Sequence, residues 1–228
     1  MTHAEPTPLP VPVDCPHVVL FGGTFDPPHV AHVSLADLGR QKLQDRIGAR
    51  AFLVFVPAAR SPHKDDAPTA TDAQRVEMLR LATHDLPDCT IWTDELDRAN
   101  EGEPSYWVRT LARAASLLAD RTLWFMIGAD QAVSFHRWRD ARRMLELAHP
   151  LVLPRHPIST AAHLRTAMAN ASFWSEGELD RWTASLIDVD LIRAASTTVR
   201  KAQGSSVDTP MHPSVLEFVR RHGLYGRT

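Results

Sequence analysis

The chain has 228 residues, of which 44% are hydrophobic and 23% charged, and its formal net charge is −2. This length suits one α/β domain, and the near-neutral charge gives no field of the kind that attracts nucleic acid. No apolar run approaches the roughly 20 residues needed to cross a bilayer, and residues 1–16 lack the pattern of a signal peptide. We therefore expect a cytoplasmic protein without nucleic-acid or membrane partners. Its two cysteines, Cys15 and Cys89, are expected to be free thiols.

The first 16 residues are rich in proline, at positions 6, 8, 10, 12 and 16. Alternating prolines favour an extended chain without internal hydrogen bonds. We expect residues 1–16 to form a flexible segment outside the fold. Residues 17–228 contain no clear linker and are expected to form one domain.

Strands and helices are expected to alternate along this domain. Short, mostly continuous apolar runs predict strands at 17–22, 51–57, 89–94, 122–128, 149–154 and 186–191. Helical spacing predicts helices near 30–46, 71–84, 105–119, 138–147 and 160–169, near 194–200, and after Pro213. This alternation predicts a doubly wound, Rossmann-like parallel α/β sheet with helices on both faces. Ligands bind such sheets beyond the carboxyl ends of the strands.

The most informative motif runs from Gly22 to His32 and reads GGTFDPPHVAH. It follows the first expected strand and leads into the first expected helix. Glycine lets the backbone approach an anion closely, and a helix N-terminus offers free N–H groups. His29 and His32 are three positions apart, so they share one face if both lie in the first turn. The motif therefore indicates a phosphate-binding loop.

Other polar residues follow the later strands. Lys64 lies in a Pro-His-Lys loop, where it is either a phosphate ligand or a solvated lysine. Asp130 follows the fourth strand, where it either accepts from a nucleoside or caps a helix. Trp138 either stacks on a planar ring or packs in the core. The segment from 196 to 200 carries hydroxyls and a guanidinium at a helix start, which suit a triphosphate or an ordinary N-cap: Ser196, Thr197 and Arg200.

Taken together, the motifs resemble those of the bacterial nicotinate mononucleotide adenylyltransferase family, within the nucleotidyltransferase superfamily. The resemblance covers residues 18–225, nearly the whole chain. Besides the first motif, it rests on Pro62-His63-Lys64, Arg75 with Met78, Pro104-Ser105-Tyr106 with Thr110-Leu111, Gly128-Ala129-Asp130-Gln131, Phe135-His136 with Trp138, Ser196-Thr197 with Arg200, and Gly223-Leu224-Tyr225.

The resemblance implies transfer of the adenylyl group of ATP to nicotinate mononucleotide in NAD biosynthesis, with Mg²⁺ held mainly through the ATP phosphates and no protein-only metal site. It implies catalytic roles for His29, His32 and Lys64. The implied ATP-binding residues are Gly22, Gly23, Thr24, Phe25, Asp130, Ser196, Thr197 and Arg200. The implied acceptor-binding residues are Tyr106, Trp107, Arg109 and Trp138.

Some positions depart from the family pattern. Ala31 stands where glycine is common between the two histidines. Trp107, Val108 and Arg109 stand where the family usually continues with Thr, a variable residue and Asp, and Arg139 stands where an aromatic residue is frequent. The changes at 107–109 and at 139 fall on the acceptor side, whereas the one methyl group of Ala31 is compatible with a helix. The acceptor-side changes leave open another acceptor, nicotinamide mononucleotide or phosphopantetheine. A separate alternative is an adenine-nucleotide-binding regulator without catalysis.

Overall fold

A five-stranded parallel sheet forms the centre of the protein, in the order β3-β2-β1-β4-β5. The computed structural model describes residues 6–59, 69–99, 105–187 and 211–226. The strands are β1 (His17–Gly23), β2 (Ala51–Pro57), β3 (Cys89–Ile91), β4 (Thr122–Gly128) and β5 (His149–Leu153). Strand β1 pairs with β2 on one side and with β4 on the other, so the direction of winding reverses at β1.

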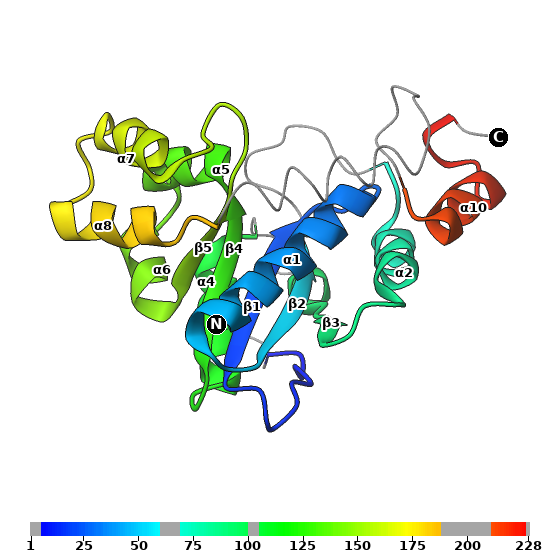
Figure 1. Cartoon of the computed structure of the whole chain (residues 1–228). Helices are drawn as coiled ribbons and strands as arrows, with labels where there is room; N and C mark the ends of the chain where they lie inside the picture. Colours follow the sequence, from blue (N-terminus) through cyan, green and yellow to red (C-terminus); the bar gives the residue numbers. More distant parts are fainter. Residues whose placement is uncertain (1–5, 60–68, 100–104, 188–210, 227–228) are drawn as a thin grey trace.

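Helices cover both faces of this sheet (Figure 1). The α-helices are α1 (Val30–Ile47), α2 (Asp72–Thr83), α3 (Asp94–Asp97), α4 (Trp107–Leu117), α5 (Ala129–Ser134), α6 (Ala141–Leu147), α7 (Ala161–Ala169), α8 (Glu176–Ala184) and α10 (Pro213–Arg221). The 3₁₀ turns η2 (Phe135–Arg137) and η3 (Leu224–Gly226) follow α5 and α10. Helix α10 packs on α2, beyond the β3 end of the sheet (Figure 1).

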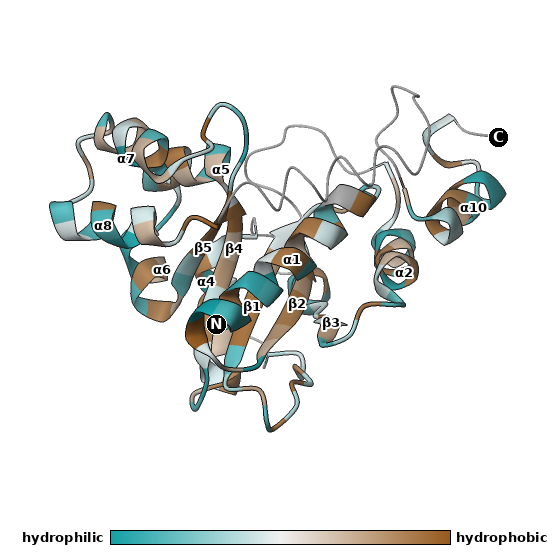
Figure 2. Ribbon diagram, viewed as in Figure 1, coloured by the Kyte–Doolittle hydropathy of each residue, from teal (hydrophilic) through white to brown (hydrophobic). Residues whose placement is uncertain are grey.

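Neighbouring residues of each strand enter opposite cores, because side chains alternate across a sheet. On β1, Val18 and Leu20 pack among residues of α4 to α8, whereas Val19 packs under α1. Both faces are covered, so the strands are hydrophobic along most of their length, as Figure 2 shows. The expected doubly wound α/β fold is confirmed.

Individual boundaries differ in informative ways. The third expected strand ends at Ile91, because α3 begins three residues later. The sixth is described only as far as Ile187, where Leu186 forms a parallel bridge with Val152 of β5. The expected helix 138–147 begins only at Ala141, as α6. Helices α3, α5 and α8 were not expected. The helix expected near 194–200 lies outside the described residues.

Residues 6–16, which belong to the segment expected to be flexible, contact the domain. Thr7 donates its backbone N–H to Asp94 of α3 over 2.9 Å, and its carbonyl accepts from the indole of Trp92 over 2.8 Å. Leu9 and Val11 pack against the core on the α4 side. Cys15 is fully buried. The segment also turns on itself, since the backbone N–H of Cys15 donates to the carbonyl of Pro12 over 3.1 Å. Its apolar side chains and backbone groups have partners on the domain.

Both cysteines are free thiols, as expected. Burial raises the pKa of the Cys15 thiol above its ordinary value, and it does the same for Cys89. Within the described residues, no helix is both long enough and apolar enough to cross a membrane.

Candidate functional site

The candidate site lies where the carboxyl ends of β1 and β4 meet at the centre of the sheet. Gly22 and Gly23 end β1, and Gly128 ends β4. The chain leaves β1 for α1 on one face of the sheet and leaves β4 for α5 on the other. Parallel sheets open a crevice at such a reversal point, and it is where they bind ligands.

The glycine loop is closely packed on its protein side. A Cβ on Gly22 would lie 2.8 Å from Cζ3 of Trp107, and a Cβ on Gly23 would lie 2.9 Å from the ring of Phe25. A side chain at either position would therefore have to displace a neighbouring aromatic ring. Phe25 is buried at φ 49° and packs edge-on against Phe21 and Phe55. Its ring anchors the loop in the core.

The two histidines lie together at the start of α1. His29 is the N-cap residue, and its side chain caps no backbone N–H. Its ring centroid lies 5.1 Å from that of His32 in the first turn. The first turn contains no acidic residue, so no carboxylate of the helix itself offsets its positive end. These features place the two imidazoles beside a helix end that favours anions.

His29 is half-buried, and its Nδ1 atom has no hydrogen-bond partner among the described residues. Burial lowers the pKa of His29 below its ordinary value, so the ring is neutral at pH 7. One ring nitrogen then carries a proton and the other accepts. A buried polar atom without a partner is costly, and a ligand phosphate would satisfy it.

Two further residues hold this loop, and neither was among the residues expected to form the site. Asp26 accepts hydrogen bonds from the backbone N–H groups of Thr69 and Ala70, over 2.6 and 3.1 Å, and from the hydroxyl of Tyr225. The fully buried Arg75 of α2 donates to the carbonyl of Thr24 over 2.7 Å. The resemblance had included Arg75 and Tyr225 without giving either a role.

The residues expected to bind the acceptor gather on the α4 side. Tyr106 is the N-cap residue of α4, and Trp107 begins the helix with its ring over Gly22.

Trp138 follows η2 and packs on Phe135, with ring centroids 5.0 Å apart. The guanidinium of Arg139 lies 4.6 Å from the centroid of the Tyr106 ring. This contact joins the start of α4 to the segment before α6. Arg109 lies in the first turn of α4.

A buried polar network supports the start of α4. Glu95 of α3 accepts from the hydroxyl of Thr110 over 2.5 Å and also interacts with the hydroxyl of Ser105. Arg98 donates to Thr110 Oγ1 over 2.8 Å. Burial raises the pKa of Glu95 to about 7, although these hydroxyls and the charge of Arg98 oppose the shift.

The neighbouring carboxylate, Asp94, has a pKa below its ordinary value. Burial opposes its ionisation, but hydrogen bonds from Arg113 and from the backbone N–H of Thr7 outweigh that effect and lower its pKa. Asp94 is therefore the ionised partner that ties residues 6–16 to α3 and α4.

Asp130 lies in the first turn of α5, directly after β4, and its carboxylate lies 3.4 Å from the guanidinium of Arg155. Its side chain is partly exposed, so a ligand can reach it. The remaining expected site residues lie outside the described residues: Lys64, Ser196, Thr197 and Arg200.

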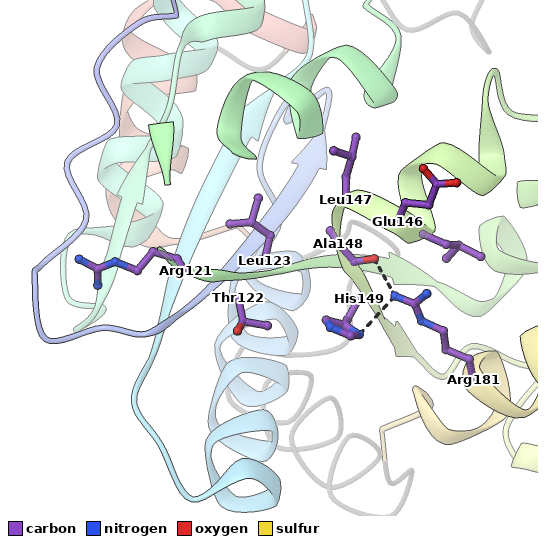
Figure 3. Close-up of a pocket in the computed structure, with 9 residues that line it drawn as sticks. Arg121, Thr122, Leu123, Glu146, Leu147, Ala148, His149 and Arg181 are labelled. Atoms are coloured by element: carbon purple, nitrogen blue, oxygen red, sulfur yellow. Dashed lines mark hydrogen bonds between the residues drawn. The ribbon is translucent and has the colours of Figure 1, made fainter. Parts of the chain in front are cut away.

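A separate pocket of about 410 Å³ lies at the opposite, amino edge of the sheet. Figure 3 shows its lining, in which Arg181 of α8 points toward Ala148 and His149 at the start of β5. The guanidinium donates to the Ala148 carbonyl and contacts His149 Nδ1, each over 3.2 Å. Arg121 donates instead to the carbonyls of Pro12 and Cys15. Both guanidinium groups therefore already donate to backbone carbonyls of the fold. The pocket is distinct from the candidate site.

The sequence profile of the cytidylyltransferase-like family matches residues 20–201. A protein of Stenotrophomonas maltophilia, named "Probable nicotinate-nucleotide adenylyltransferase", is 32% identical over 219 residues, which cover 91% of this chain and 96% of that protein. A protein of the same name from Xylella fastidiosa is 31% identical over 220 residues, with the same coverage of both chains.

The chain belongs to the nicotinate-nucleotide adenylyltransferase family. Solved structures agree with the fold. The nicotinic acid mononucleotide adenylyltransferase of Plasmodium falciparum complexed with NaAD superimposes with a TM-score of 0.63 at 16% identity, covering 93% of this chain and 98% of that one. The same enzyme complexed with APC gives a TM-score of 0.62 at 15% identity, with the same coverage. In this family member, the glycine loop and the histidine pair lie together at the reversal point of the sheet.

Proposed function

We propose that this protein transfers the adenylyl group of ATP to nicotinate mononucleotide, forming deamido-NAD and pyrophosphate in NAD biosynthesis. Membership of the family supports the reaction. The observation that carries the proposal is the histidine pair at the start of α1, where the buried Nδ1 of His29 has no partner among the described residues. A phosphate oxygen placed there would satisfy that atom beside a helix end whose first turn contains no acidic residue.

The chemistry is an in-line displacement at phosphorus. An oxygen of the nicotinate mononucleotide phosphate attacks the α-phosphorus of ATP, a new P–O bond forms, and the bond to the bridging oxygen of pyrophosphate breaks. The attacking oxygen is already ionised near neutral pH, so no strong general base is required. Positioning and charge stabilisation then supply most of the acceleration.

The ATP side of the site is assigned to residues around the β1–α1 loop. The backbone from Gly22 to Phe25 would lie against the phosphates, while His29 and His32 would donate to the transferred group. Asp130 would accept from the adenosine. The cations and hydroxyls assigned to the phosphate chain are Lys64, Ser196, Thr197 and Arg200.

The acceptor side is assigned to the residues around the start of α4. Tyr106, Trp107 and Arg109 would contact nicotinate mononucleotide, and Trp138 would face its pyridine ring. The contact between Trp107 and Gly22 supports this assignment, because it brings the start of α4 against the loop that would hold the α-phosphate.

Mg²⁺ would bind mainly through ATP phosphate oxygens and water, and it would neutralise charge on the leaving pyrophosphate. The described loop fits this arrangement, because its carboxylate, Asp26, already accepts hydrogen bonds from three groups of the protein and is not needed as a metal ligand. We place the enzyme in the cytoplasm, where a reducing environment suits its two free thiols.

The test measures pyrophosphate release by the purified protein with ATP and each of three acceptors in parallel: nicotinate mononucleotide, nicotinamide mononucleotide and phosphopantetheine. The highest kcat/KM is expected with the nicotinate form. A preference for another acceptor would reassign the substrate. ATP binding by calorimetry without turnover on any acceptor would instead favour a regulator.

A further inference from the structure

The hydroxyl of Tyr225, close to the carboxyl end of the chain, reaches the candidate phosphate loop. It donates to Oδ1 of Asp26, which lies 199 positions earlier and three residues before His29. Both side chains are half-buried. Burial and the adjacent Asp26 carboxylate raise the pKa of the Tyr225 phenol above its ordinary value, so it remains a hydrogen-bond donor throughout the neutral range.

The backbone around Tyr225 is arranged to deliver this side chain. Tyr225 has φ 58°, in the left-handed region that favours glycine, between Gly223 at φ 59° and Gly226 at φ 65°. A residue with a Cβ is unfavourable in that conformation. The unfavourable backbone conformation at Tyr225 therefore has to be offset by contacts of its side chain. One of these contacts is the hydrogen bond from its hydroxyl to Asp26.

The turn that carries Tyr225 packs on a buried apolar cluster formed by α2 and α10. Val215 and Val219 of α10 are fully buried against Met78 of α2, and Leu224 and Tyr225 pack on the same cluster. Helix α2 also supplies Arg75, which holds the carbonyl of Thr24 over 2.7 Å. One packed unit, α2 with α10 and η3, thus grips the loop at two points, Thr24 and Asp26.

We propose that Tyr225 is a positioning residue for the phosphate loop: by holding Asp26, it fixes the segment that presents His29 to the nucleotide. The inference rests on the proposed function, because it assigns the loop to ATP. It gives Gly223-Leu224-Tyr225 a role in nucleotide handling that acts through Asp26. Its effect has to pass through the loop and hence through His29.

The test is a double-mutant cycle in kcat/KM for ATP, using Tyr225→Phe and His29→Ala in the full-length protein. Tyr225→Phe removes one hydroxyl that donates to a carboxylate, and it should lower kcat/KM about tenfold. In the His29→Ala background the same change should cost less than about twofold, since the group being positioned is gone. Leu216→Ala is the matched control, because Leu216 packs on the same α10 cluster and its truncation leaves the hydroxyl of Tyr225 in place. It should lower Tm and leave kcat/KM for ATP within about twofold of wild type.

A Tyr225→Phe variant with wild-type kcat/KM would overturn the proposal. So would the same tenfold loss in both backgrounds, or an equal kinetic loss in Leu216→Ala, because each indicates a general structural role. If Tyr225→Phe is unfolded at the assay temperature, Asp26→Asn takes its place in the cycle with the same expectations. Calorimetry of ATP alone separates the two proposals: a wild type that binds ATP but turns over no acceptor refutes the proposed function. In that case, several-fold weaker ATP binding by Tyr225→Phe would support the positioning role, and unchanged binding would reject it.

Discussion

Replacing Glu95 by Gln should change the pH dependence of folding stability. Burial raises the pKa of Glu95 from an ordinary value of 4.5 to about 7 in the folded protein. The folded state therefore holds this proton more tightly than the unfolded chain does. Its contribution to stability is fully present below pH 4.5 and is lost as the pH rises through 7. The difference between the two pKa values corresponds to about 3 kcal/mol across this window, at 1.36 kcal/mol per pKa unit.

Glutamine cannot lose this proton, and its amide can still pair with the hydroxyls of Thr110 and Ser105. Urea unfolding at pH 5, 6, 7 and 8 gives the free energy of unfolding of both proteins. The variant should gain about 2.5 kcal/mol relative to wild type between pH 5 and pH 8, because a small part of the contribution is already lost at pH 5. The exposed Glu217→Gln is the control, and its difference from wild type should hardly vary with pH. A Glu95→Gln difference that stays constant across the range would refute the reasoning.

Three further predictions concern the loop and the amino-terminal segment. His29→Ala should lower kcat for pyrophosphate release about 100-fold or more at saturating ATP, as for the loss of a transition-state donor, and near-normal turnover would remove its assigned role. Gly22→Ala should cost about 1–3 kcal/mol in urea unfolding, because its Cβ would lie 2.8 Å from an indole ring, whereas Gly177→Ala, whose Cβ would meet no atom within 4 Å, should cost nothing. Deleting residues 1–8 should lower Tm by several degrees, because the indole N–H of Trp92 loses its acceptor; an unchanged Tm would show that this contact adds no stability.

The sheet and its long helices could be predicted from local pattern, whereas the shorter helices could not. Strand β2 is apolar at nearly every position, and helix α1 runs from Val30 to Ile47 where helical spacing predicts 30–46. Helix α8 escaped prediction although it carries a usable signal: Ser175 and Glu178 form a capping box at its start. Helix α3 has four residues, too few for any periodicity to appear.

The candidate site could likewise be predicted only in part. The loop from Gly22 to His32 is contiguous in sequence, so its residue types alone indicate phosphate binding. The contacts that hold it are not contiguous, since Tyr225 lies 199 positions from Asp26. Nothing local in either segment specifies that pairing, which depends on how α10 packs against α2. For the same reason, the ring of Trp107 over Gly22 became visible only in the folded structure.

The central place of β1 has a consequence for the order in which the chain can fold during synthesis. Strands β2 and β3 are complete by Ile91, so one half of the sheet can form early. The other edge of β1 pairs with β4, in register from His17 opposite Thr122, more than 100 positions later. Until β4 emerges from the ribosome, that edge offers unpaired backbone groups to other chains. Nascent chains that end before Thr122 are therefore expected to associate with one another. Pairing of β4 with β1 should prevent this association.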